Sequence, residues 1–450
     1  MRRLARWVLL TFVLSCVLLS VMLFLLQRWI ATDDFRDRVQ AQASEALGRE
    51  VRLGALAVDV WPLPGVALNR VEIVTRPVIR IERIEVRPVL AALWSGRLEL
   101  STLLVLGADL SQPAFDDLAQ AWRARKLPAG PGSGSGQRQG AASDSAAGMG
   151  VTAILLPQRI VLDSATWRGN SGVATMFNAD ARLNLQGLPE DLRVTLLAGP
   201  LQGTRLGLHR QADDWNVDVE IAGGTIKGKL QMPRAPGPAP ALELNGQLET
   251  RNVELGVLLR AQQRESEGAA ADGRTAMSGR LQASTNFKAH ARDWGGLLDA
   301  LQSQSRVVVH HAVVHGIDLA QAVRSAGLSR GGQTRLDTLT GLVDTRGRTI
   351  DLRNLAASSG ALSATGNVTI SPERQLQGRV DVQLGAKMVG KAIGVPLQVE
   401  GTLDKPQLRL TRAAMAGAAI GTLIMPGVGT GVGATLGEKI GESLKGLLGK

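Results

Sequence analysis

The chain begins with a run that constrains everything after it: from Val8 to Leu26 no residue carries a charge, and most are large and apolar. An α-helix rises about 1.5 Å per residue, so this run can cross the roughly 30 Å hydrocarbon core of a bilayer. The run is too long for the apolar core of a signal peptide, and no small-residue cleavage pattern follows it. We therefore expect residues 1–30 to form a membrane anchor with one spanning helix.

Charged residues on the two sides of this run predict its orientation. Arg2, Arg3 and Arg6 precede it, and cytoplasmic flanks of membrane helices are enriched in Arg and Lys. Beyond the run, arginines are interleaved with aspartates between Asp33 and Arg38. We expect a cytoplasmic N-terminus, with the bulk of the 450 residues on the opposite side of the membrane.

The composition of the exported part argues against a compact catalytic domain. Aromatic residues make up 3% of the chain, Tyr is absent and there are 52 glycines. A core of Leu, Val, Ile and Ala with this much glycine favours an extended, mainly β architecture. Cys16 is the single cysteine and lies within the apolar run, which leaves the exported part without a disulfide framework. We expect Cys16 to face lipid, with acylation as the alternative.

The net charge of +11 does not indicate a nucleic-acid partner. The arginines are scattered along alternating segments, and no basic run is interleaved with aromatic residues on which bases could stack. Positive charge on an exported chain can attract anionic lipid headgroups, and the alternative is a surface that is simply solvated.

The periodicity of apolar residues changes soon after the anchor. Thr32 can cap a helix that Gly48 would end, and apolar residues between them fall on one helix face. From Val51 onward apolar residues recur at every second position, as expected for strands, with an irregularity near Arg83. Two short helices are expected later in the chain, at 294–302 and 317–328.

A short pattern recurs in the strand-like segments: Gly, a polar residue, a branched apolar residue and a second polar residue. Each copy places its apolar side chain on one face of a sheet and its polar side chains on the other. The irregular spacing between copies indicates a repeated type of strand rather than a solenoid of fixed period. The copies begin at Gly228, Gly246, Gly279, Gly366, Gly378 and Gly401.

Two further segments are defined by their composition. Residues 128–150 are dominated by Gly, Ser, Ala and Gln, which predicts a flexible linker or a disordered insertion within one sheet. The tail carries glycines on a four-residue grid, which on a helix form one stripe where another helix or a membrane can approach. A flexible or self-packed tail is the alternative. The stripe consists of Gly417, Gly421, Gly429, Gly433, Gly437 and Gly441. The expected regions are 1–30, 31–127, 128–150, 151–411 and 412–450.

The usual catalytic and cofactor-binding patterns are missing. His310, His311 and His315 lie close in sequence, but no cysteine or nearby carboxylate completes a metal shell. Residues 385–392 imitate a phosphate-binding loop, yet Ala392 replaces the hydroxyl residue that would hold magnesium, and Pro396 interrupts the helix that such a loop requires. We expect neither an enzyme nor a nucleotide, metal or other cofactor site.

Several segments together resemble the AsmA family of bacterial envelope proteins. They include the apolar N-terminal run, the turn at 61–65, and Ile81-Glu-Arg-Ile-Glu-Val-Arg-Pro-Val-Leu90. The resemblance continues through residues 93–96 and 106–109, and resumes at 399–407. It implies an inner-membrane protein whose periplasmic part is a long, folded-over β-sheet with an apolar groove. The glycine-spaced tail departs from this family pattern.

The resemblance further implies kinship with bridge-like lipid-transfer proteins. We therefore expect a periplasmic protein that binds or transfers phospholipid through an apolar β-groove and supports outer-membrane lipid homeostasis. Acyl chains gain about 0.8 kcal/mol per buried CH₂, so a continuous apolar trough can hold them without specific contacts. The groove residues cannot be assigned before the sheet register is known. The alternative function is an assembly factor that contacts outer-membrane protein strands at an open sheet edge.

Overall fold

The computed structural model describes most of the chain between Asp33 and Ala414. It divides the chain into two compact units, Met1–Gln202 and Gly203–Lys450, called here the N-terminal and C-terminal units. The described residues are 33–59, 65–89, 100–126, 157–184, 187–232, 242–267, 275–291, 295–297, 299–325, 331–360, 362–384, 393–403, 405–411 and 414.

Several predicted features lie outside these residues. They are the anchor with Val8–Leu26 and the preceding arginines, residues 128–150, and the glycine stripe from Gly417 to Gly441. Among the helices that the structure does describe, none is long and apolar enough to span a bilayer.

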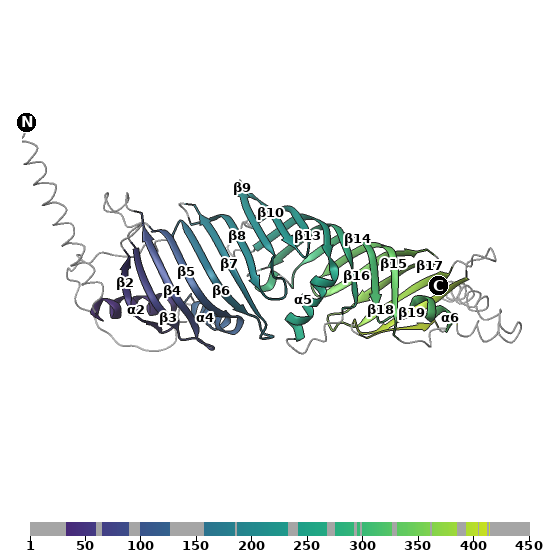
Figure 1. Cartoon of the computed structure of the whole chain (residues 1–450), viewed down its shortest axis with the longest axis horizontal. Helices are drawn as coiled ribbons and strands as arrows, with labels where there is room; N and C mark the ends of the chain where they lie inside the picture. Colours follow the sequence, from purple (N-terminus) through teal and green to yellow (C-terminus); the bar gives the residue numbers. More distant parts are fainter. Residues whose placement is uncertain are drawn as a thin grey trace, which may run out of the picture. The chain divides into compact units, whose positions relative to one another are not determined.

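The N-terminal unit is a sheet with two flanking helices (Figure 1). The predicted helix between Thr32 and Gly48 is confirmed. Its last turn passes into Gly48, whose φ of +68° is readily adopted only by glycine. The elements are α2 (Asp33–Leu47), β1 (Val51–Leu53), β2 (Leu56–Asp59), β3 (Gly65–Ile73), β4 (Ile79–Pro88), β5 (Leu100–Ser111), α4 (Gln112–Lys126), β6 (Arg159–Arg168), β7 (Ala174–Leu183) and β8 (Pro189–Ala198).

One strand pair of this unit is parallel. β1 and β2 both pair with β3, and pairing then continues in sequence from β3 to β8. All of these pairs are antiparallel except β5 with β6. Parallel neighbours need a long crossover connection, and the chain from Gln112 to Gln158 supplies it. The strands on either side of residues 128–150 therefore belong to one sheet.

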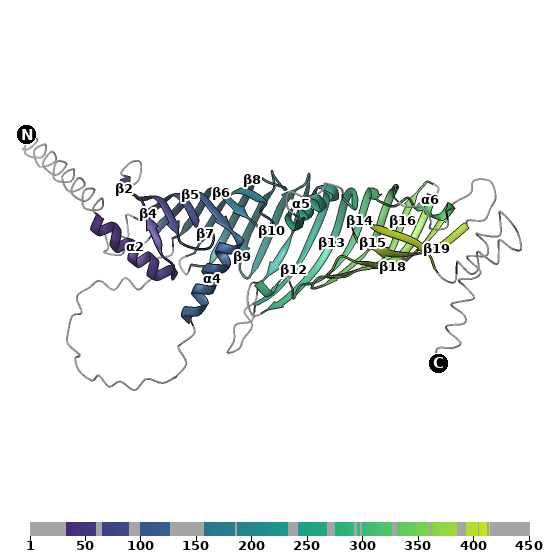
Figure 2. The same ribbon diagram turned by 90° about the horizontal axis from the view of Figure 1, so that it is seen from below.

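The helix α4 lies against one side of this sheet (Figure 2). Ala114 on its first turn is fully buried, and the ring of Phe115 lies 5.4 Å from the ring of Trp167 on β6. Arg49, just after α2, forms an ion pair with Asp117 of α4 at 2.6 Å. These contacts fix the start of the crossover on the sheet.

Apolar side chains of the N-terminal unit collect on one face of the sheet. Residues in register on neighbouring strands share a face, so each row of partners can be read across β3 to β8. Three such rows are almost entirely aliphatic. They are Val66, Val86, Leu103, Ile160, Ala181 and Leu192; Leu68, Ile84, Val105, Leu162, Ala179 and Val194; and Val71, Ile81 and Ala108, continued by Ala165, Phe177 and Leu196.

The irregularity expected near Arg83 lies on the neighbouring strands instead. The register of β4 with β3 and β5 passes Arg83 without a shift. Arg70 and Gly107, on those two strands, have φ of +53° and +60° and lie at the level of Glu82. The strain is therefore carried by residues flanking β4, while Ile81 and Ile84 still reach the same face.

The C-terminal unit is an antiparallel sheet in which each strand pairs with the next along the chain. Among the described residues no pair joins β20 back to β9, so this sheet is open. Its elements are β9 (Arg205–Gln211), β10 (Asp214–Ile221), β11 (Gly224–Gln231), β12 (Leu242–Glu254), α5 (Leu255–Glu267), β13 (Met277–Ala291), η2 (Gly295–Leu297), β14 (Gln302–His315), α6 (Leu319–Arg324), β15 (Gln333–Arg346), β16 (Thr349–Ser359), β17 (Leu362–Ile370), β18 (Leu376–Leu384), β19 (Ile393–Gly401) and β20 (Pro406–Leu410).

The two short helices expected in this unit differ in outcome. The one at 317–328 is confirmed in a shorter form as α6. The one at 294–302 is wrong, because the chain makes only a 3₁₀ turn at Gly295–Leu297 and Gln302 already begins β14. Two adjacent glycines, Gly295 and Gly296, open this turn, and glycine is a poor helix former.

Candidate functional site

The apolar face of the C-terminal unit is the leading candidate for a functional surface. On β12, Leu248 is half-buried, whereas its neighbours Gln247 and Glu249 are exposed on the opposite face. The same alternation runs through β9 to β13. Its half-buried apolar members are Leu206, Leu208, Val219, Ile221, Ile226, Leu230, Leu244, Leu248, Leu281 and Phe287. Trp215, Val217 and Val253 on the same face are buried, whereas the half-buried members keep part of their surface accessible to solvent or a ligand.

The same face is covered further along the sheet. Leu319 and Ala322 of α6 are buried against strands β14 to β20, within one apolar cluster. Val382 and Leu397 in this cluster have no exposed surface. The chain therefore fills its own apolar face beneath α6, but leaves it only partly covered over β9 to β13.

Hydrogen bonds to one threonine hold α6 in place. The Oγ1 of Thr334, on β15, accepts from the backbone N–H of Leu319 at 2.9 Å and donates to the carbonyl of Ile317 at 2.8 Å. The carboxylate of Asp318 caps the helix by accepting from the N–H of Gln321 at 2.9 Å. Thr334 itself is buried, so its hydroxyl satisfies groups that water cannot reach.

The recurring glycine pattern marks this apolar face. Gly228, Gly246, Gly366 and Gly378 all occupy strand positions that alternate with polar residues, as the pattern predicted. A Cβ at Gly246 would come within 2.5 Å of the ring of Phe287, so that ring lies across the glycine. The two other copies differ: Gly279 lies at a bulge with φ of +138°, and Gly401 ends β19 with φ of +88°.

The polar face of the N-terminal unit is largely neutralised by ion pairs. Arg159 on β6 donates twice to Asp180 on β7, at 2.9 Å and 2.7 Å. This hydrogen-bonded guanidinium holds the pKa of the Asp180 carboxyl below its ordinary value. Arg168 pairs with Asp109 at 2.9 Å. These arginines are therefore already engaged with carboxylates of their own sheet.

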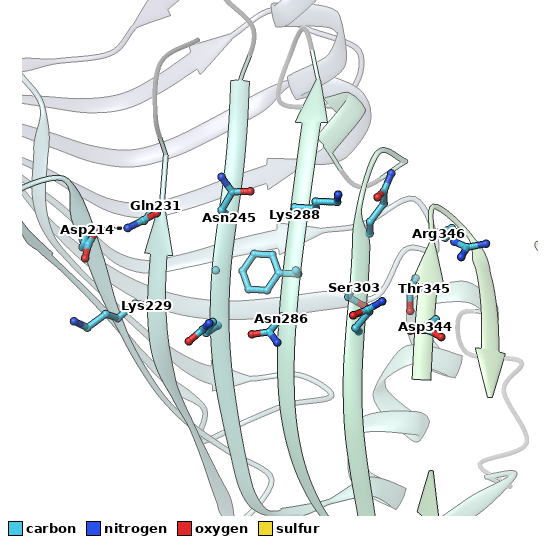
Figure 3. Close-up of a pocket in the computed structure, with 15 residues that line it drawn as sticks. Asp214, Lys229, Gln231, Asn245, Asn286, Lys288, Ser303, Asp344, Thr345 and Arg346 are labelled. Atoms are coloured by element: carbon cyan, nitrogen blue, oxygen red, sulfur yellow. Dashed lines mark hydrogen bonds between the residues drawn. The ribbon is translucent and has the colours of Figure 1, made fainter. Parts of the chain in front are cut away.

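A pocket of about 690 Å³ crosses the ends of six strands, β10 to β15, within the C-terminal unit (Figure 3). Most of its lining residues carry polar side chains, in contrast to the apolar face. Its lining residues are Asp214, Lys229, Gln231, Asn245, Gly246, Gln247, Asn286, Phe287, Lys288, Gln302, Ser303, Gln304, Asp344, Thr345 and Arg346. The sequence offered no signal for this pocket, because its residues come from strands far apart in the chain.

The histidines form no metal centre in the part of the chain that the structure describes. No three His, Cys, Asp or Glu side chains there are grouped as metal ligands would be. His311 lies at a strand irregularity with φ of +50° and is exposed. His315 instead contacts the hydroxyl of Ser278 through Nε2 at 3.3 Å. The loop-like sequence at 385–392 lies outside the described residues.

Comparison with known proteins adds no identification. No protein-family model, curated protein or solved structure matches the chain.

Proposed function

We propose that this chain is an inner-membrane-anchored periplasmic protein that holds phospholipid acyl chains along its apolar sheet face. The observation that carries the proposal is the half-buried state of most of the aliphatic side chains on this face of β9 to β13, including Leu208 and Leu248. Sheet faces of this composition are normally covered by a second layer, and this stretch of the sheet is covered only in part.

The energetics favour an aliphatic ligand over a polar one. Each acyl CH₂ removed from water contributes about 0.8 kcal/mol, so a chain lying across several strands gains stability without directional contacts. Leu206, Leu208 and Leu248 offer flexible aliphatic surface of this kind.

The N-terminal unit supports the same function. Three aliphatic rows cross β3 to β8, although part of them packs around Val105, Ala108 and Ala165. The resemblance of the segments between residues 61 and 109, and of residues 399–407, to the AsmA family points in the same direction. We propose membership in that family, with the anchor and the glycine-spaced tail as its membrane contacts and outer-membrane lipid homeostasis as its role.

Site-specific photocrosslinking of the full chain in its membrane tests this function. A photoreactive residue replaces Leu208 or Leu248 on the apolar face, and His209 or Gln247 serves as the matched control, one position away on the opposite face. After irradiation, capture of labelled phospholipid is measured by mass spectrometry. We expect capture at the two leucine positions and little at the two controls.

Two results would contradict the proposal. Equal capture at Leu248 and Gln247 would mean that lipid is encountered by diffusion and not held on one face. Capture of polypeptide and no lipid at the leucine positions would favour the assembly-factor alternative. A probe at Gln407, exposed on the terminal strand β20, reports whether a partner strand adds to that edge.

A further inference from the structure

The polar pocket across β10 to β15 is organised as rows of residues in register. One row contains Gln231, Asn245, Lys288, Gln302 and Arg346, and a second contains Lys229, Gln247, Asn286, Gln304 and Asp344. Gly246, Phe287, Ser303 and Thr345 lie in the row between them. Each strand thus presents hydrogen-bonding side chains at the same two levels as its neighbours; Figure 3 shows Asn245 of the first row and Asn286 of the second.

The spacing of these groups is set by the sheet. Neighbouring strands lie about 4.8 Å apart, so the four intervals from Lys229 on β11 to Arg346 on β15 cover about 19 Å. A single phosphate or sulfate ion could contact only one end of such a row. The pocket suits an elongated polar ligand that crosses the strands.

The hydrogen-bonding groups of the pocket are available to a ligand. Within the part of the chain that the structure describes, the side chains of Gln247, Asn286 and Gln304 make no hydrogen bond to protein. A carboxamide both donates and accepts, which matches neighbouring hydroxyl groups that also do both. An acyl chain would leave these amides unpaired and desolvated, so the pocket is unsuited to the cargo proposed for the apolar face.

The charges of the pocket favour an anionic ligand. Lys229, Lys288 and Arg346 are exposed, and none has an ion-pair partner among the described residues. The two acidic residues are already engaged: Asp214 accepts from Gln231 at 2.8 Å, and buried Asp344 is paired with Arg353. Gln231 is neutral, so Asp214 keeps its negative charge, but the three cations outnumber this one carboxylate and leave the pocket with an excess of positive charge.

We propose that this pocket binds a negatively charged oligosaccharide, laid across strands β11 to β15. Its hydroxyl groups pair with the carboxamides, and its anionic groups lie beside Lys288 and Arg346. This site is separate from the apolar face and does not depend on lipid binding.

Calorimetric titration of the detergent-solubilised full chain tests the proposal, at low salt because exposed charges are screened. The probes are a sulfated maltotetraose, unmodified maltotetraose and sodium sulfate. We expect saturable binding of the sulfated sugar, binding about tenfold weaker for the unmodified sugar, and no binding of sulfate alone.

Paired variants separate the two kinds of contact. Replacing Asn286→Ala together with Gln304→Ala should weaken both sugars by about tenfold, and Lys288→Gln should weaken only the sulfated one. Gln377→Ala with Gln383→Ala and Arg335→Gln are the matched controls, because these residues are exposed on strands of the same unit outside the pocket. The controls should bind as the unaltered chain does.

Three outcomes would overturn the proposal. They are no saturable binding of either sugar, binding unchanged by the Asn286 and Gln304 replacements, and heats reproduced by sodium sulfate alone. Binding to phosphatidylglycerol vesicles that Lys288→Gln abolishes, without sugar binding, would also overturn it by identifying a membrane contact. Lipid capture at Leu248 is measured separately and should be unchanged in these variants, so failure of one proposal is distinguishable from failure of the other.

Discussion

The backbone N–H of Asn354 on β16 donates a hydrogen bond to Oδ1 of Asn367 on β17 at 2.9 Å. Asn354 has φ of +51°, and the register of the two strands shifts by one residue at this point. The N-terminal unit contains the same arrangement, in which Ser164, with φ of +54°, donates to Oδ1 of Asn178 at 2.8 Å. Both units thus stabilise a bulge with an asparagine from the neighbouring strand.

Replacing Asn367 with alanine should lower the free energy of unfolding by about 0.5–1.5 kcal/mol, because the N–H of Asn354 loses its protein acceptor but can still reach water. Asn354→Gly should cost less, since glycine adopts positive φ without strain. Urea unfolding of the full chain in detergent measures both. A larger loss for Asn354→Gly than for Asn367→Ala would contradict this account of the bulge.

Gly246→Ala should destabilise the C-terminal unit by about 1–3 kcal/mol, because the added methyl group would overlap the ring of Phe287 and the carbonyl of Lys229. Gly207→Ala is the matched control. Its Cβ would lie 3.6 Å from its nearest neighbour, the carbonyl oxygen of Asp218, which is an ordinary van der Waals contact. Thermal unfolding compares the two variants. Equal midpoints would show that the position of the Phe287 ring does not require a glycine at residue 246.

Thr334→Val should loosen α6 and cost about 1–3 kcal/mol, because the buried N–H of Leu319 and the carbonyl of Ile317 lose their shared partner. Thr338→Val on the same strand is the control, since its hydroxyl pairs with Ser358 at an exposed position. Hydrogen exchange of the Leu319 amide reports the effect locally. Unchanged protection in Thr334→Val would mean that α6 is held by packing alone.

Asp180→Asn should remove a pH-dependent contribution to stability of about 0.5–1 kcal/mol, small because Arg159 is substantially exposed. The pKa of Asp180 is lowered in the folded chain, so its contribution is present above the ordinary value of 3.8 and is lost as the pH falls through the folded pKa. Compared with the parent chain, the loss of unfolding free energy should be largest at pH 7 and should shrink as the pH is lowered below 3.8. A difference in unfolding free energy that does not change with pH would rule out the charge of Asp180 as its cause.

Sequence periodicity predicts much of this fold, because burial on one face of a strand or helix produces a regular spacing of apolar residues in the sequence. The alternation around Leu248, the helix ending at Gly48 and the short helix near Leu319 are all recovered from local patterns. The helix expected at 294–302 is wrong because its apolar residues are spaced as in a helix, but two adjacent glycines disfavour one.

The candidate sites are less accessible to sequence reasoning. Assigning Leu208 and Leu248 to one face requires the strand register, which a single sequence does not contain. The polar pocket is harder still, since Lys229, Asn286 and Arg346 are brought together only when successive hairpins align. Polar residues of these types are common on exposed strand faces. Only their alignment across neighbouring strands identifies the pocket.

The position of α6 limits how cargo could travel in the C-terminal unit. Leu319 and Ala322 occupy the apolar surface of the last strands, so that stretch is already taken by the protein itself. A lipid held on β9 to β13 could not continue along this face, because α6 already covers it. Onward passage would require α6 to move off the apolar surface of the last strands, which its contacts with them and with Thr334 oppose.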